Sequence, residues 1–203
     1  LDVSVESQWI DTVNTTIQRY GQLDITVNNA GMSVPESRVK VEDTTIEIWD
    51  RLHAVNSTGV FLGTKHSIPP MRANGSGSII NISSINTGKS YVGMPHYDSS
   101  KAGLEALTRP CALEYAEHGV TANVISPGAV KTPGSMTVRG NLAKERGDPT
   151  TAEVDAEFAS RIPLGDWATP DMIGQATTLL ATPAASYITG QTIYVDGGLK
   201  LTI

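Results

Sequence analysis

The sequence predicts an α/β protein built around a doubly wound parallel sheet, that is, a sheet with helices on both of its faces. Two observations support this fold class. Short apolar runs typical of buried strands alternate along the chain with longer segments that have the apolar spacing of amphipathic helices. Strands joined by helical crossovers run parallel, and such crossovers are right-handed. With 203 residues, the chain is expected to form one domain, or most of one.

The first elements follow from apolar spacing and from helix-breaking residues. A helix is expected over residues 5–20, where apolar residues recur every four positions until Gly21 ends the pattern. Residues 23–27 form a short apolar run and predict a strand. A long helix is expected over residues 45–68, which Pro69-Pro70 and then Asn74-Gly75-Ser76-Gly77 should bring to an end.

The same alternation continues to the end of the chain. Residues 78–84 and 120–125 predict buried strands, and residues 97–118 between them predict a helix. A helix over residues 170–181 and a strand over residues 190–195 follow. These elements complete the strand and helix order that a doubly wound sheet requires.

Ser84, Tyr97 and Lys101 are the residues around which the predicted elements are arranged. Tyr97 and Lys101 lie four residues apart near the start of a helix, so both side chains should share one helical face. An ammonium beside a phenol favours the phenolate and lowers the pKa of the tyrosine towards that of a general acid/base. Ser84 ends a buried strand, at the sheet edge where ligands bind in open α/β folds.

This Ser, Tyr and Lys arrangement resembles the active site of the short-chain dehydrogenase/reductase family. The resemblance extends over nearly the whole chain and implies an NAD(P)-dependent oxidoreductase that transfers hydride between a nicotinamide cofactor and a secondary alcohol or ketone, cyclic by preference. It implies Tyr97 as general acid/base, Ser84 as donor to the substrate oxygen, and Lys101 as the group that lowers the Tyr97 pKa and binds the ribose. Asn56 matches the family's fourth catalytic residue, which holds a water connected to the lysine.

The resemblance also implies the cofactor contacts. The expected cofactor-binding residues are Asp2, Val3, Asn29, Ala30, Gly31, Tyr97, Lys101, Pro127, Gly128, Val130 and Thr132. Among them, the Val130 backbone and the Thr132 hydroxyl would hold the nicotinamide carboxamide. Asp2 would accept from the adenine, although a helix-capping Asp is an equally good interpretation. The cofactor is expected to be NAD or NADP, with NAD slightly favoured.

A pocket for the substrate is expected beside these residues. In the resembled family, the matching positions lie at the substrate pocket. The expected lining residues are therefore Asn86, Met94, His96 and Ala129. Residues 133–163 are polar with scattered glycines, which predicts an irregular, mobile segment that covers the substrate.

The start of the family's fold has no counterpart in this sequence. A strand, a Gly-rich phosphate turn and a helix should come first, yet no such glycine cluster precedes Gly31. The chain is therefore expected to be N-terminally incomplete. An alternative interpretation is a truncated, catalytically inactive family member that serves as a binding or assembly subunit.

Composition limits the partners. The net charge of −6 and the pI near 5.1 argue against nucleic acid or an anionic membrane as a partner. The single cysteine, Cys111, excludes an internal disulfide, and the four histidines have no metal-ligand spacing, so no metal is expected. A cytoplasmic location and a homo-oligomer, either dimer or tetramer, are expected, although Pro110 inside the 97–118 helix could weaken the subunit contacts.

Overall fold

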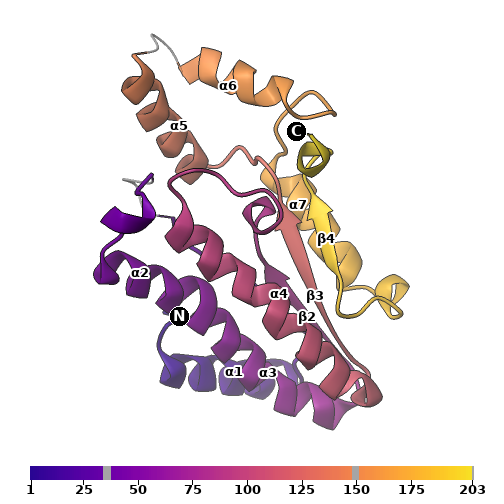
Figure 1. Ribbon diagram of the computed structural model, residues 1–203. Helices are drawn as coiled ribbons and strands as arrows, with labels where there is room; N and C mark the ends of the chain where they lie inside the picture. Colours follow the sequence, from indigo (N-terminus) through magenta and orange to yellow (C-terminus); the bar gives the residue numbers. More distant parts are fainter. Residues whose placement is uncertain (34–37, 148–150, 203) are drawn as a thin grey trace.

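The computed structural model describes residues 1–33, 38–147 and 151–202, and it has a four-stranded parallel sheet in the order β1-β2-β3-β4 (Figure 1). The strands are β1 (Ile25–Asn28), β2 (Gly77–Ile82), β3 (Val120–Pro127) and β4 (Thr192–Val195). Every predicted strand is present, and the predicted α/β class with a doubly wound sheet is confirmed.

The two central strands are buried on both faces, as their continuous apolar sequences predict. In β2, Ile79 and Ile80 are both fully buried but point to opposite faces of the sheet. Ile79 packs with Met71 and Val120, whereas Ile80 packs with Leu180 and others on the second face. The sheet therefore separates two apolar cores.

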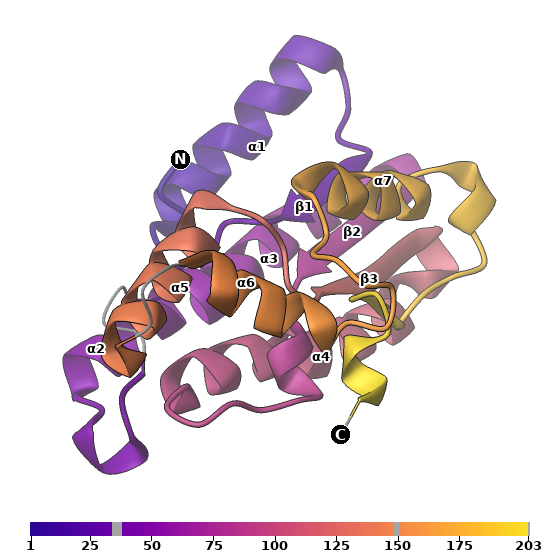
Figure 2. The same cartoon turned by 90° about the horizontal axis from the view of Figure 1, so that it is seen from above.

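Helices cover each core. On one face lie α1 (Glu6–Tyr20), α3 (Gly59–Asn74) and α4 (Pro95–Tyr115); α7 (Pro170–Leu180) covers the other. Figure 2 shows the strands between α4 and α7. Pro110 lies inside α4, as the sequence predicted. In the described part of the chain, no helix is both long and apolar enough to cross a membrane.

The predicted helix over residues 45–68 is not one regular α-helix. It begins as α2 (Ile46–His53), passes through a π-helical turn (Ala54–Thr58) and continues as α3. The prediction that Pro69 and Pro70 stop it was wrong, since α3 runs on to Asn74, whereas the predicted stop at Gly75, with φ 72°, is confirmed. Pro69 has no N–H to donate to the carbonyl of Lys65, four residues earlier. Because Lys65 is exposed, water can form that hydrogen bond instead.

The predicted irregular segment is helical. Residues 133–163 form α5 (Pro133–Arg146) and α6 (Thr151–Ser160), which lie beyond the carboxyl ends of the strands (Figure 1). The prediction of irregular backbone was wrong because Thr132 and Ser135 form a reciprocal capping box and Pro133 occupies the first turn, which together start a helix. Residues 148–150, where a further part of the segment was predicted to be irregular, lie outside the described residues.

Candidate active site

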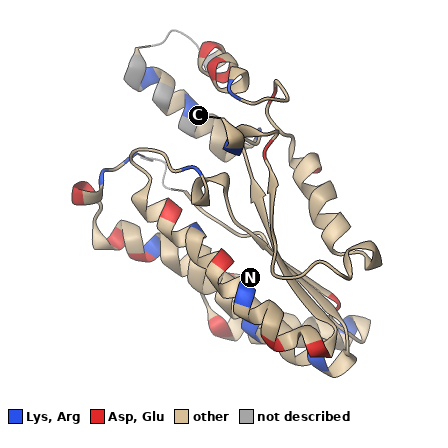
Figure 3. Ribbon diagram, turned by 45° about the vertical axis from the view of Figure 1, so that its right-hand side comes forward, with Lys and Arg blue, Asp and Glu red and all other residues tan. Residues whose placement is uncertain are grey.

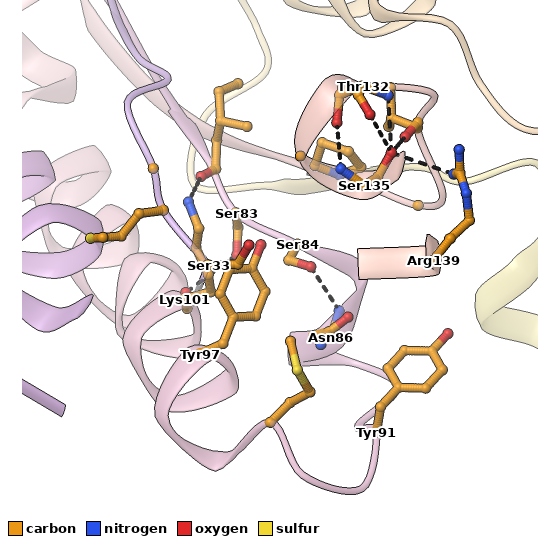
Figure 4. A pocket seen from close by; sticks show the side chains of 18 of the residues that line it. Ser33, Ser83, Ser84, Asn86, Tyr91, Tyr97, Lys101, Thr132, Ser135 and Arg139 are labelled. Atoms are coloured by element: carbon orange, nitrogen blue, oxygen red, sulfur yellow. Dashed lines mark hydrogen bonds between the residues drawn. The ribbon is translucent and has the colours of Figure 1, made fainter. Parts of the chain in front are cut away.

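A cavity of about 480 Å³ opens at the carboxyl ends of the strands (Figure 4). It brings together most of the predicted site residues. Those that line it are Asn29, Gly31, Ser84, Asn86, Met94, Tyr97, Lys101, Pro127, Gly128, Val130 and Thr132. These residues come from four separate stretches of the chain, so the sheet topology is what assembles the site.

Ser84 reaches the cavity because β2 ends two residues before it. Its backbone is extended, with φ −156° and ψ 150°, and a short helical turn follows at once. The Ser84 Oγ accepts a hydrogen bond from the Asn86 backbone N–H at 3.2 Å. A hydroxyl has one proton to donate, and this contact uses only an acceptor position. The Ser84 proton is therefore directed to the cavity side, where the Tyr97 phenol oxygen is its nearby acceptor.

Lys101 and Tyr97 lie in the first turns of α4, with their side chains on the same side of the cavity (Figure 4). The Lys101 Nζ donates to the Ile82 carbonyl at 2.8 Å, which holds the amine at the end of β2. Burial lowers the pKa of Lys101 to about 8. A Cβ at Gly31 would lie 3.1 Å from this Nζ, so a side chain there would make a close contact with the Lys101 amine.

The ionisation of Tyr97 differs from the prediction. Burial raises the pKa of Tyr97 above its ordinary value, and the neighbouring Ser84 hydroxyl opposes the shift. The sequence predicted that Lys101 would lower this pKa. That prediction was wrong, because burial is the largest influence on the phenol and Lys101 is not among the groups that shift its pKa.

Asn56 lies beneath the cavity rather than on its surface. It is fully buried in the π-helical turn, and its side chain binds both backbone groups of Met32: Oδ1 accepts from Met32 N at 2.8 Å and Nδ2 donates to Met32 O at 2.9 Å. Nδ2 also donates to Ser100 Oγ at 3.0 Å. Asn56 thus joins the segment after β1 to α4. Its contact with a catalytic water stays a prediction.

The predicted nicotinamide contacts lie where β3 leads into α5. Thr132 caps α5: its Oγ1 accepts from Ser135 N at 3.1 Å, which again uses an acceptor position and not the hydroxyl proton. The Val130 carbonyl accepts from Ser135 Oγ at 2.6 Å. A Cβ at Gly128 would meet Asp196 at 2.7 Å, so the close approach of these two segments requires glycine.

The remaining predicted cofactor residues adjoin a second hollow of about 250 Å³. Val3, Asn29 and Ala30 line it, and Asn29 also lines the main cavity. Asp2 does not line either hollow. Its carboxylate accepts from the Ser4 backbone N–H and hydroxyl, and these hydrogen bonds lower the pKa of Asp2. The structure therefore favours the local turn as its role, and the adenine contact stays a prediction.

Two residues expected in the substrate pocket do not line the cavity. His96 is fully buried, burial lowers its pKa, and neither ring nitrogen has a hydrogen-bond partner among the described residues. Ala129 packs against a cluster that includes Ile85 and Trp167. The prediction put His96 in the pocket because it precedes Tyr97, but successive helical residues point about 100° apart. No group of three His, Cys, Asp or Glu residues in the described ranges could hold a metal ion.

Several lining residues were missed by sequence reasoning. Tyr91 and Arg139 lie on the wall away from Tyr97 (Figure 4), and Phe158 and Trp167 also line the cavity. Arg139 and Phe158 lie in the segment predicted to be irregular, where no helical face could be assigned to them. The one available signal was the capping pattern at Thr132, because a helix starting there has a definite face on which Arg139 can be placed.

Comparison with known proteins shows the family of this chain. The family model described as enoyl-(acyl carrier protein) reductase matches residues 1–200. The chain belongs to this family, the short-chain dehydrogenases/reductases. Its members are oxidoreductases.

Individual relatives agree with this assignment. The 3-oxoacyl-(acyl-carrier-protein) reductase FabG of Thermotoga maritima is 35% identical over 99% of this chain and 76% of its own length. The 2,5-dichloro-2,5-cyclohexadiene-1,4-diol dehydrogenase LinX of Sphingobium indicum is 33% identical over 100% of this chain and 75% of its own. The crystal structure of a gluconate 5-dehydrogenase from Burkholderia cenocepacia, in complex with NADP and tartrate, superposes with a TM-score of 0.85 at 30% identity, covering 100% of this chain and 74% of that one.

Proposed function

We propose that this chain catalyses NAD(P)-dependent hydride transfer between a secondary alcohol, cyclic by preference, and the corresponding ketone. The convergence of Ser84, Tyr97 and Lys101 on one cavity supports the proposal most directly, since a proton acceptor, an oxygen ligand and a cation are the groups that this reaction needs. The family of the chain supports the class of reaction.

The residues present fit a nicotinamide cofactor. Gly31 and Gly128 line the main cavity without a side chain that would project into it, and the second hollow adjoins the first through Asn29. Val130 and Thr132 would hold the carboxamide, and Lys101 would bind the ribose. When bound, the nicotinamide ring supplies the acceptor for the hydride. NAD and NADP are both proposed as cofactors.

In the proposed oxidation, Tyr97 takes the proton of the substrate hydroxyl group while the hydride leaves the carbon that bears this group. The Ser84 hydroxyl donates a hydrogen bond to the substrate oxygen, which keeps this oxygen beside Tyr97. Burial disfavours the Tyr97 phenolate. In the proposed reaction, the positive charge of protonated Lys101 stabilises this phenolate. Reduction of the ketone runs the same steps backwards, with Tyr97 donating the proton.

The proposal is tested by following the hydrogen that is transferred. A secondary alcohol deuterated at the carbinol carbon is incubated with the protein and NAD or NADP, and the reduced cofactor is analysed by NMR. Deuterium is expected at C4 of the nicotinamide. A protein that binds the cofactor but transfers no deuterium from any of a panel of linear and cyclic secondary alcohols would contradict the proposal and favour a binding or assembly subunit.

The names of the relatives do not identify one substrate class for this chain. They are named for a 3-oxoacyl group, a chlorinated cyclohexadienediol and gluconate, which differ in size and charge. The panel therefore has to include each of these chemical types. Assembly into a dimer or tetramer is also proposed, and light scattering at assay concentration tests it.

A further inference from the structure

The charged side chains of the cavity all have the same sign. Lys101, Arg38 and Arg139 line it, and among the described residues no Asp or Glu does. This is unexpected in a chain of net charge −6, whose acidic residues are spread over the outer helices (Figure 3). Lys101 already has a place in the proposed reaction. The two arginines do not.

Arg139 is the more constrained of these arginines. It is 5% exposed, its guanidinium lies 4.1 Å from the centre of the Trp167 ring, and its Nε lies 2.5 Å from the Asp155 carboxylate. One of its Nη groups lies 3.4 Å from Ser135 Oγ, at the start of α5. These contacts hold the guanidinium in one position on the cavity wall. Arg38, by contrast, is exposed.

The hydrogen-bonding capacity of Arg139 is larger than these contacts require. A guanidinium has five N–H donors, and the contacts with Asp155 and Ser135 account for two of them. The Tyr91 ring lies on the same wall, opposite Lys101 and Tyr97 (Figure 4). A ligand that spans the cavity from the catalytic residues would therefore end beside a fixed arginine and a phenol.

We infer that the substrate carries a carboxylate, bound by Arg139 on the wall opposite the reacting hydroxyl group. The inference rests on the proposed function and narrows it to hydroxy acids and keto acids. A planar guanidinium held by an ion pair and a stacked indole matches a carboxylate, which can accept two parallel hydrogen bonds from it. A cationic ligand would meet Arg38 and Arg139 in a low-dielectric site with no described carboxylate on its lining.

Matched ligands with and without the charge test the inference. Binding of cyclohexanecarboxylate and cyclohexanecarboxamide is measured by calorimetry, and kcat/KM is measured for a hydroxycyclohexanecarboxylate and its carboxamide. The acid of each pair is expected to be favoured by about tenfold or more, the effect of one charge-assisted hydrogen bond. Equal binding and equal kcat/KM within both pairs would overturn the carboxylate inference while leaving hydride transfer intact. Failure of every alcohol to react would instead overturn the proposed function.

Variants assign the effect to Arg139. Arg139→Met should reduce the acid preference to about one, whereas Arg51→Gln, which removes an exposed arginine of α2, should leave it unchanged. An Arg139→Met protein that folds and keeps the preference would overturn the role of Arg139. If that variant does not fold, Arg139→Lys decides, because it keeps the positive charge but loses the planar guanidinium that can bind a carboxylate at two points. The acid preference should then fall by a few-fold, and an unchanged preference would contradict the role of Arg139.

Discussion

At the scale of single residues, burial sets the ionisation of both Lys101 and Tyr97. The spacing of Tyr97 and Lys101, the strand before Ser84 and the family resemblance together predicted one site, and all three residues line one cavity. Their pKa values could not be predicted in the same way, because burial and the Ile82 carbonyl depend on the packed structure. Arg139 was missed for a similar reason: its contacts with Asp155 and Trp167 exist only in the fold.

The buried Lys101 predicts a pH dependence of stability. Its pKa is lowered to about 8 in the folded protein from 10.5. Between these pH values the unfolded chain holds more protons than the folded protein, so the free energy of unfolding rises with pH across the window. Relative to Lys101→Met, the wild-type protein should gain about 3 kcal/mol from pH 8 to 10.5. Urea unfolding of both proteins at several pH values measures this difference, and parallel pH curves would contradict it.

Ser84 supplies a second prediction at this scale. Ser84→Ala removes the donor to the substrate oxygen and should lower kcat about 10²-fold, with little change in the free energy of unfolding. Ser99→Ala is the matched control, since the Ser99 hydroxyl bonds back to Pro95 O within α4 at 2.7 Å, away from the cavity. The two variants are compared by steady-state kinetics. Equal effects on kcat would show that Ser84 has no special part in the reaction.

At the scale of elements, the strands and the helices α1 and α7 could be predicted, whereas α5 and α6 could not. The central strands are short continuous apolar runs, buried on both faces of the sheet. Gly21 ends α1 as predicted. In contrast, α5 depends on a four-residue capping signal at Thr132 that scattered glycines obscured. The only sequence signal for the π-helical turn around Asn56 is the resemblance to the family's asparagine that kinks a helix, and the turn is fixed by the bonds to Met32 and Ser100.

The cap of α5 links an element to the site. Thr132→Ala should lower the free energy of unfolding by about 1 kcal/mol and increase amide exchange in the first turn of α5. It should also weaken cofactor binding, because Thr132 is a proposed contact. Thr169 caps α7 in the same way, away from the cavity, so Thr169→Ala should cost similar stability without loss of binding. Mass-spectrometric exchange and cofactor titration measure both effects. Equal binding by the two variants would contradict the assignment.

At the scale of the whole molecule, the parallel sheet is what brings the site together. Ser84 follows β2, Tyr97 and Lys101 lie in α4, and Val130 and Thr132 follow β3, yet all five line one cavity. This arrangement could be predicted, because ligands bind at the carboxyl ends of the strands in open α/β sheets. The far wall of the cavity could not, because it is built from α5 and α6.

The central claim is that Tyr97 exchanges the proton of the substrate hydroxyl while hydride is transferred. Single-turnover hydride transfer is the most direct test, measured by the absorbance of reduced nicotinamide after mixing cofactor-loaded protein with a secondary alcohol. Tyr97→Phe should bind the cofactor with nearly unchanged affinity and transfer hydride about 10²- to 10⁴-fold more slowly. A Tyr97→Phe variant that transfers hydride at the wild-type rate would contradict the account.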